Sequence, residues 1–144
     1  MRYLNKIVFI NSAAIRYSEV QLDGNIHLIG TQGVGKSTIL RAILFFYNAD
    51  TQRLGIPVEK KSYQDYYFPY ADSSIIYEVA REDGWFTVLS YKTMNRICYR
   101  FIASPYRPDL FIDEEGAPYP SDRIRSVLDK NGIKYSLSLI HISE

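Results

Sequence analysis

One octapeptide, Gly30-Thr31-Gln32-Gly33-Val34-Gly35-Lys36-Ser37, constrains this chain more than any other feature. An apolar run at residues 26–29 leads into it, and an apolar helical pattern at residues 39–47 follows it. A strand, a glycine-rich loop and a helix with the spacing G-x-x-x-x-G-K-S are the arrangement of a phosphate-binding loop. The alternative is a glycine-rich turn with an incidental lysine, although a chance match in a chain this long is expected only about half a per cent of the time. The sequence therefore predicts an α/β chain built around a nucleoside triphosphate.

Each residue type in the loop has a physical role in binding phosphate. Glycines at three positions allow backbone conformations closed to other residues and leave room for the phosphate. The loop N–H groups and the positive end of the following helix then face a common concavity. Lys36 supplies a positive charge, and the Ser37 hydroxyl can ligate Mg2+. The expected nucleotide-binding residues are Gly30, Thr31, Gln32, Gly33, Val34, Gly35, Lys36, Ser37 and Thr38, with Ser37 as the Mg2+ ligand.

Length, charge and cysteine content limit the class of protein. A chain of 144 residues is one domain or part of one. The net charge of +1 gives no overall attraction to nucleic acid or anionic membranes, although a local basic patch remains possible. A single cysteine, Cys98, rules out an intramolecular disulfide framework and fits a reducing compartment. The sequence shows no membrane-spanning run and no signal peptide, so we expect a cytoplasmic protein with no membrane partner.

The first part of the chain reads as strands that precede the loop. Residues 6–10 and 17–22 have strand patterns, and residues 26–30 form the strand that feeds the loop after a turn at residues 23–25. The helix after the loop is apolar nearly all round, so we expect it to be buried on most sides. Two strands before the phosphate loop are typical of ABC-type ATPase heads, whereas small GTPases and nucleotide kinases place the loop after the first strand.

The second part of the chain predicts an antiparallel meander. Residues 74–81, 85–91 and 96–102 read as strands, with a hairpin turn at residues 82–84. Cys98 lies in the last of these strands among apolar neighbours, which indicates a small buried hydrophobe rather than a catalytic thiol. A helix is expected from Ser121, acting as its N-cap, to about Lys130, with Gly132 closing it.

The opening sequence resembles a known family of ATPase heads. The stretch KIVFINSAAIRYSEVQLDGNIHLIGTQGVGKSTILRAILFFY is similar to the start of SMC/Rad50/RecF heads, which run strand, short connection, strand, and then an apolar strand into G-x-N-G-x-G-K-S. It departs from them at Gln32, where the family usually has Asn, and at Ala13-Ala14-Ile15 in the first connection. The resemblance extends over residues 1–136 and implies the N-terminal lobe of an ABC-type P-loop NTPase, with the meander beside the loop strand and helix.

The resemblance also implies an activity and partners. It implies binding of ATP with Mg2+ and a full-length ATPase that acts on DNA in repair, chromosome organisation or defence against foreign DNA. The partners it implies are DNA, a second head in a head-to-head homodimer, and a C-terminal half joined through a coiled coil. That half would carry the Walker B strand and the Leu-Ser-Gly-Gly signature. Because those motifs and the Q-loop are missing here, we expect ATP binding without turnover.

Residues 110–114 (LFIDE) allow two interpretations. Three apolar residues followed by Asp113 and Glu114 imitate a Walker B strand, in which the Asp would hold Mg2+ and the Glu would position water. A proline precedes the run and a Glu-Gly turn follows it, which favours a short hairpin instead. The order of the following segments also matches the SMC pattern. We therefore expect Asp113 and Glu114 at a hairpin tip, with the Walker B role as the weaker alternative.

An aromatic stretch and the last residues of the chain complete the sequence expectations. Tyrosines and Phe68 at residues 63–70, interleaved with Lys60 and Lys61, could stack bases or could pin a long loop onto the head.

Residues 137–144 (LSLIHISE) match the translation of a transposase end sequence that is used to prepare sequencing libraries. We therefore expect a non-native tail after residue 136.

Three other classes of protein stay open at this point. An ABC transporter ATPase subunit would use an early aromatic residue such as Tyr17 to stack adenine. A complete small P-loop NTPase would use Asp113 and Glu114 as its Walker B pair. The third class is a binding module whose phosphate loop is degenerate.

Overall fold

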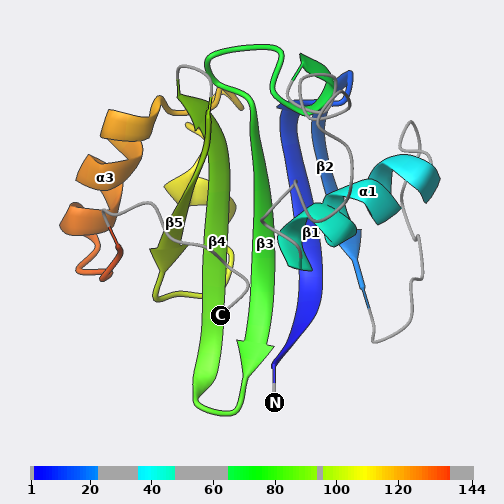
Figure 1. The fold of residues 1–144 in the computed structure, drawn as a ribbon. Helices are drawn as coiled ribbons and strands as arrows, with labels where there is room; N and C mark the ends of the chain where they lie inside the picture. Colours follow the sequence, from blue (N-terminus) through cyan, green and yellow to red (C-terminus); the bar gives the residue numbers. More distant parts are fainter. Residues whose placement is uncertain (1, 23–35, 48–64, 94–95, 137–144) are drawn as a thin grey trace.

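A five-stranded antiparallel sheet forms the centre of the computed structural model, which describes residues 2–22, 36–47, 65–93 and 96–136 (Figure 1). The order of strands across the sheet is β2-β1-β3-β4-β5. In chain order the elements are β1 (Arg2–Ser12), β2 (Ile15–Gln21), α1 (Lys36–Tyr47), β3 (Ser74–Arg81), β4 (Gly84–Thr93), β5 (Arg96–Ile102), the 3-10 turn η2 (Pro108–Leu110) and α3 (Ser121–Lys130).

The strands predicted from hydrophobic patterning are confirmed at five positions. Residues 6–10, 17–22, 74–81, 85–91 and 96–102 all fall on strands of the sheet, except that Leu22 lies one residue past the end of β2. β1, β2 and β4 also extend by up to four residues beyond their predicted ranges. The hairpin between β3 and β4 turns at Glu82 and Asp83, and Gly84, which pairs with Arg81, has a φ of +143°, a conformation that side chains disfavour. β1 pairs with β2 on one side and with β3 on the other, so neither of its edges is open to a further strand. The strand predicted at residues 26–30 lies outside the described residues.

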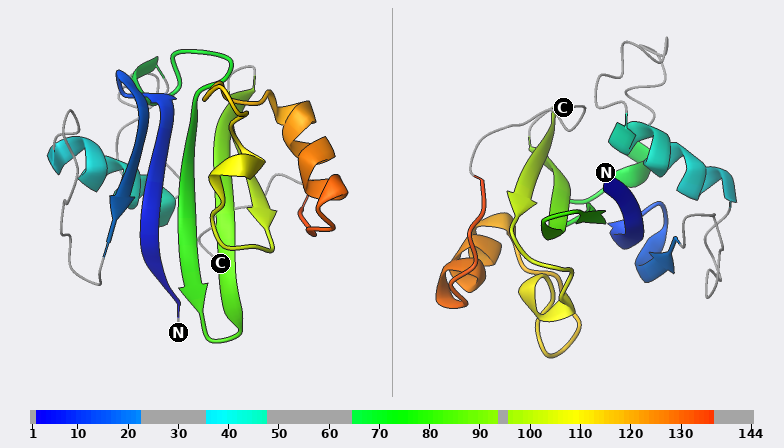
Figure 2. Two further views of the ribbon diagram at one scale, coloured as in Figure 1. Left: turned by 180° about the vertical axis from the view of Figure 1, so that it is seen from behind. Right: turned by 90° about the horizontal axis from the view of Figure 1, so that it is seen from below.

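Both faces of the sheet are covered, and alternate residues of each central strand serve the two faces. On one face, Phe9 and Tyr77 pack beneath α1. On the other face, Val8 and Ile76 pack beneath η2 and α3. Figure 2 shows α1 on the opposite side of the sheet from η2 and α3. Double coverage explains why β3, buried from Ser74 to Ala80, shows an almost unbroken apolar run.

Helix α1 buries one face rather than its whole circumference. Ile39, Ala42 and Phe46, spaced by three and four residues, lie against the sheet. The Tyr77 hydroxyl donates to the Ala42 carbonyl oxygen at 3.1 Å, and the Phe46 and Tyr77 rings lie 4.6 Å apart. Leu40 on the outer side is 42% exposed. The expectation of burial nearly all round is therefore wrong at Leu40, which lies on the side of α1 away from the core that Ile39, Ala42 and Phe46 join.

The connection between β1 and β2 is a tight left-handed turn. Asn11, Ala13 and Ala14 have φ values of 47°, 52° and 62°. For alanine this conformation costs roughly 1–2 kcal/mol per residue. The turn is held by Ala13 N–H, which donates to the Tyr66 carbonyl at 3.1 Å, and by the Ser73 hydroxyl, which donates to the Asn11 carbonyl. The short alanines that depart from the family pattern thus sit where the chain is pinned to a distant segment.

Helix α3 confirms one of the two predicted end signals. Gly132 has a φ of +69°, and its N–H and that of Ile133 bond back to the Asp129 and Leu128 carbonyls, so Gly132 closes the helix as expected. The N-cap is Pro120, however, and no side chain caps the helix. The expectation that Ser121 is the N-cap is therefore wrong, because the extended backbone of Pro120 makes Ser121 the first helical residue.

Candidate functional site

The N-terminus of α1 is the described part of the predicted nucleotide site. The helix begins at Lys36, the lysine of the phosphate-loop motif. Its first N–H groups consequently have no acceptor within the helix, which is the condition for binding an anion there. Gly30 to Gly35 and the side chains of Lys36 and Ser37 lie outside the described residues, so their roles stay predictions. Of the predicted binding residues, Thr38 has a described side chain.

Two tyrosines from a helical turn at residues 65–67 contact Thr38. The Tyr67 hydroxyl donates to the Thr38 carbonyl at 2.6 Å. The Tyr66 hydroxyl lies 3.2 Å from the Thr38 hydroxyl, and the two tyrosine rings meet edge to face with centroids 4.9 Å apart. Burial raises the pKa of Tyr67 above its ordinary value of 10.0, so its phenol stays a hydrogen-bond donor at neutral pH. This pair therefore fixes the first turn of α1 next to the predicted phosphate loop.

The aromatic stretch mainly anchors the chain to the fold. Tyr67 and Phe68 are each 1% exposed and belong to the core beneath α1. This confirms the interpretation that rings in this stretch pin the segment to the body of the protein. Tyr66 and Tyr70, in contrast, are 46% and 64% exposed. Lys60, Lys61 and Tyr63 lie outside the described residues, so the base-stacking alternative stays a prediction.

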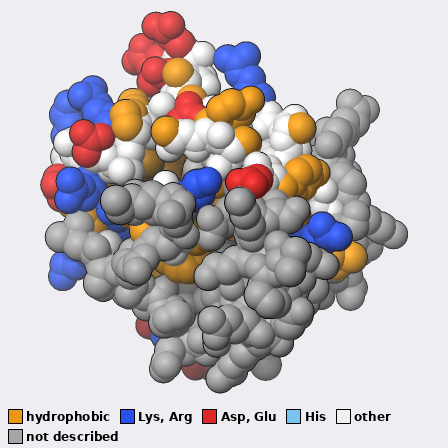
Figure 3. All heavy atoms as spheres, turned by 45° about the horizontal axis from the view of Figure 1, so that its top comes forward, with side chains coloured by type: hydrophobic (Ala, Val, Ile, Leu, Met, Phe, Trp, Pro, Cys, Tyr) orange, Lys and Arg blue, Asp and Glu red, His pale blue; other side chains and the backbone are white. Residues whose placement is uncertain are grey.

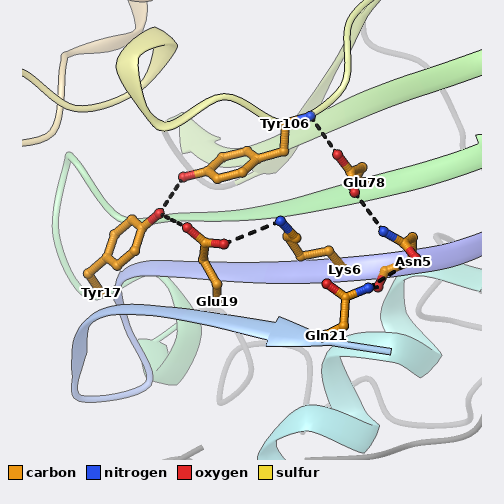
Figure 4. A network of polar contacts seen from close by, with 7 residues as sticks. All are labelled: Asn5, Lys6, Tyr17, Glu19, Gln21, Glu78 and Tyr106. Carbon is orange, nitrogen blue, oxygen red and sulfur yellow. Dashed lines mark hydrogen bonds and ion pairs between the residues drawn. The ribbon is translucent and has the colours of Figure 1, made fainter. Parts of the chain in front are cut away.

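A second polar cluster lies on the face of the sheet opposite α1 (Figure 4). The Lys6 ammonium is 3.3 Å from a Glu19 carboxylate oxygen, and the Tyr17 hydroxyl donates to the other oxygen at 2.7 Å. The Tyr17 and Tyr106 hydroxyls are 2.8 Å apart. Burial raises the pKa of Tyr17 to about 12. These contacts tie the segment after β5 to the two strands at the other side of the sheet.

Glu78 is the buried carboxylate at the centre of this cluster. It is 6% exposed, and its two oxygens accept from Asn5 Nδ2 at 2.8 Å and from the Tyr106 backbone N–H at 2.7 Å. Gln21 Nε2 in turn donates to Asn5 Oδ1 at 3.1 Å. These hydrogen bonds converge on the Glu78 carboxylate, which accepts from Asn5 on one side and from Tyr106 on the other. The sequence carries a signal for this buried carboxylate that was not used above: Glu78 is the one charged residue inside the apolar run SIIYEVA.

Asp113 and Glu114 lie at a hairpin tip, as the stronger interpretation expects. Asp113 N–H donates to the Ala117 carbonyl, and Gly116 N–H donates to the Asp113 carbonyl. Asp113 Oδ1 also accepts from the N–H groups of Glu115 and Ala117, both at 2.9 Å. The preceding residues form η2 instead of a strand, on the face away from α1 (Figure 2). The Walker B alternative requires a strand beside the phosphate loop, and this geometry does not provide one.

The double change Asp113→Asn with Glu114→Gln is expected to be nearly silent. Asn keeps the side-chain oxygen that accepts the two turn N–H groups, and Glu114 is exposed, so unfolding should change by about 0.5 kcal/mol or less. Asp113→Ala, which removes the acceptor, should cost about 1 kcal/mol more. Denaturant titration measures the stability of both variants, and calorimetry measures how well they bind nucleotide. Loss of Mg2+-dependent nucleotide binding in the double variant would restore the Walker B interpretation.

Several other kinds of site are not seen among the described residues. No three His, Cys, Asp or Glu side chains in these segments gather as metal ligands. Cys98 is 3% exposed, which confirms the expected buried hydrophobe. None of the described helices combines the length and apolar character needed to cross a bilayer. Acidic and basic side chains are interspersed on the described surface in Figure 3, so this view shows no continuous basic patch.

Comparison with known proteins gives one match. A family model described as "Protein of unknown function (DUF3584)" matches residues 11–142. The match begins at Asn11, near the end of β1, and includes the phosphate-loop motif, α1, the meander and α3. It also continues past residue 136, into the residues expected to be non-native. No curated protein and no solved structure matches the chain.

Proposed function

Because the chain belongs to the DUF3584 family over most of its length, and because α1 begins at the motif lysine, we propose that it is the ATP-binding N-terminal lobe of an SMC/Rad50/RecF-like ATPase. The observation that carries this proposal is the start of α1. A helix N-terminus directly after a glycine-rich loop presents unpaired N–H groups and a positive dipole to phosphate. The hairpin of β1 and β2 before the loop also supports it, because that order is the one expected of ABC-type heads.

Each residue of the proposed site has a role in binding. The backbone of Gly30 to Gly35 cradles the phosphates, Lys36 neutralises the terminal phosphates, and Ser37 ligates Mg2+. Thr38 completes the first helical turn, and Tyr67 holds it through the Thr38 carbonyl. Bound Mg2+ supplies charge neutralisation to the β- and γ-phosphates.

We propose that this chain binds ATP without hydrolysing it. Hydrolysis needs a group that positions water and further charge stabilisation in the transition state. In ABC-type heads these come from the Q-loop, Walker B and the signature motif of an opposing head. The described hairpin at Asp113 and Glu114 is on the far face from α1 and does not substitute for them. The full-length protein would act on DNA as a head-to-head homodimer completed by its C-terminal half.

The geometry weakens the transporter alternative. That alternative needs an aromatic residue early in the chain whose ring stacks on adenine, and Tyr17 is the residue expected in this role. The Tyr17 hydroxyl is instead bonded to Glu19 and Tyr106, on the side of the sheet away from α1 (Figure 4). Tyr17 is therefore committed to the polar cluster and does not face the predicted nucleotide.

Lys36→Ala tests the proposed function. Loss of charge-assisted contacts to phosphate, at about 1.5–3 kcal/mol each, should weaken ATP–Mg2+ binding roughly 10- to 100-fold. Lys130→Ala is the matched control, because Lys130 is exposed at the end of α3 on the opposite face and should leave affinity unchanged. Calorimetry with ATP and Mg2+ measures both variants. Equal affinity in parent and Lys36→Ala would overturn the nucleotide assignment.

A further inference from the structure

The first turn of α1 carries a hydroxyl group, that of Thr38, beside the proposed nucleotide site. Thr38 is the third residue of α1, which begins at Lys36, so it lies among the N–H groups that have no acceptor within the helix. Side chains of an α-helix lean towards its N-terminus, which is the end where a phosphate would bind. Thr38 can therefore offer its O–H, as well as its N–H, to a phosphate oxygen.

The Thr38 hydroxyl has one partner within the described part of the chain, the Tyr66 hydroxyl at 3.2 Å. Tyr66 reaches it from a segment that is already fixed. The Tyr66 carbonyl accepts from the Ala13 N–H at 3.1 Å, and its ring meets the Tyr67 ring edge to face with centroids 4.9 Å apart. Tyr67 is 1% exposed, and its hydroxyl donates to the Thr38 carbonyl at 2.6 Å. The Tyr66 hydroxyl is thus placed before any ligand arrives.

The chemistry of phosphate decides which of these two hydroxyls donates. In the free protein either oxygen of the Thr38–Tyr66 pair can be the donor. The charged oxygens of a nucleotide accept hydrogen bonds, so Thr38 must turn its proton to the phosphate, and the Thr38 oxygen is then free to accept from Tyr66. Each hydrogen bond in such a chain polarises the next and strengthens it. Without the Tyr66 hydroxyl, the Thr38 hydroxyl loses both this polarisation and its fixed orientation.

We propose that Tyr66 is a positioning residue of the nucleotide site, whose hydroxyl donates to Thr38 while Thr38 donates to a phosphate oxygen of bound ATP. Tyr66 acts through Thr38 and does not itself contact the nucleotide. The proposal rests on the proposed function, because it takes the phosphates to lie at the N-terminus of α1. The observation that it adds is the pair of hydroxyls on the first turn of this helix.

Tyr66→Phe measures the contribution of this hydroxyl. Calorimetry with ATP and Mg2+ should show binding about two- to tenfold weaker than in the parent chain, as expected for the loss of one hydrogen bond between uncharged groups. Tyr70→Phe is the matched control, because it makes the same substitution in the same segment at a side chain that is 64% exposed, and it should leave the affinity unchanged. Denaturant unfolding without nucleotide should be the same in both variants, since the Tyr66–Thr38 bond is exposed to water.

Changes at Thr38 test whether Tyr66 acts through this residue. Thr38→Ser keeps the hydroxyl, so Tyr66→Phe should weaken ATP binding by the same factor in that background. Thr38→Val keeps the shape of the side chain but removes the hydroxyl, so Tyr66→Phe should have no further effect there, as a double-mutant cycle requires. A loss of affinity on Tyr66→Phe that persists in the Thr38→Val background would overturn the positioning role.

Lys36→Ala separates this inference from the proposed function. If Lys36→Ala weakens ATP binding and Tyr66→Phe does not, the nucleotide site stands and the positioning role of Tyr66 is overturned. If the parent chain shows no ATP binding that depends on Lys36, both proposals are overturned together.

Discussion

Raising the pH above about 10 is expected to unfold this protein steeply. Tyr67, Tyr99 and Tyr106 are 1%, 7% and 7% exposed, and burial raises the pKa of each above its ordinary value of 10.0. The unfolded chain then loses these protons first, so the stabilising contribution is complete below pH 10 and is lost as the pH rises towards the folded-state pKa values. Each group contributes about 1.4 kcal/mol per pH unit in that range, or about 4 kcal/mol for three. A domain with about 5–8 kcal/mol of stability, at the lower end of the ordinary range, would unfold between about pH 11 and 12.

Denaturant titrations at a series of pH values, followed by circular dichroism, measure this slope. Tyr99→Phe should remove about a third of the slope that Tyr67, Tyr99 and Tyr106 together contribute, because it removes one of these three phenols. Tyr70→Phe is the control, since water already reaches the Tyr70 ring in the folded protein, where it is 64% exposed. A spectroscopic titration in which every tyrosine of the folded protein ionises together near pH 10 would contradict the expected linkage.

Glu78→Leu is expected to destabilise the fold by about 3 kcal/mol or more. The change leaves the Asn5 amide and the Tyr106 N–H without their acceptor, at about 1–3 kcal/mol for each buried donor. One of these donors is the backbone N–H of Tyr106, so no apolar side chain at position 78 can replace the lost hydrogen bond. Glu78→Gln should cost less, because it keeps one acceptor oxygen but turns an amide donor towards the other N–H group.

Thermal and denaturant unfolding measure the effect of both Glu78 variants. Glu114→Leu makes the same substitution at the exposed hairpin tip and should change stability by less than about 0.5 kcal/mol. If Glu78→Leu were as stable as Glu114→Leu, the polar cluster would not be what fastens the segment at Tyr106 to the sheet.

Much of the local structure could be predicted from the sequence because short-range rules fix it. Alternation and apolar runs located the described strands, and the glycines at positions 84 and 132 marked the turn and the helix end at which they have positive φ. The hairpin at Asp113 followed from its flanking proline and glycine. The phosphate-loop motif predicts a nucleotide site, and the start of α1 at Lys36 agrees with the context that the motif needs.

The tertiary structure alone decided which distant residues meet. Asn5 and Glu78 are 73 positions apart, and nothing in either local pattern indicates that one will donate to the other. The same holds for Tyr66 and Tyr67 against Thr38, and for Arg100 between two tyrosine rings. Hydrophobic periodicity determines the conformation of a segment and which side of it is buried. The order of strands, and therefore the partner that a buried polar group finds, depends on how the segments pack together.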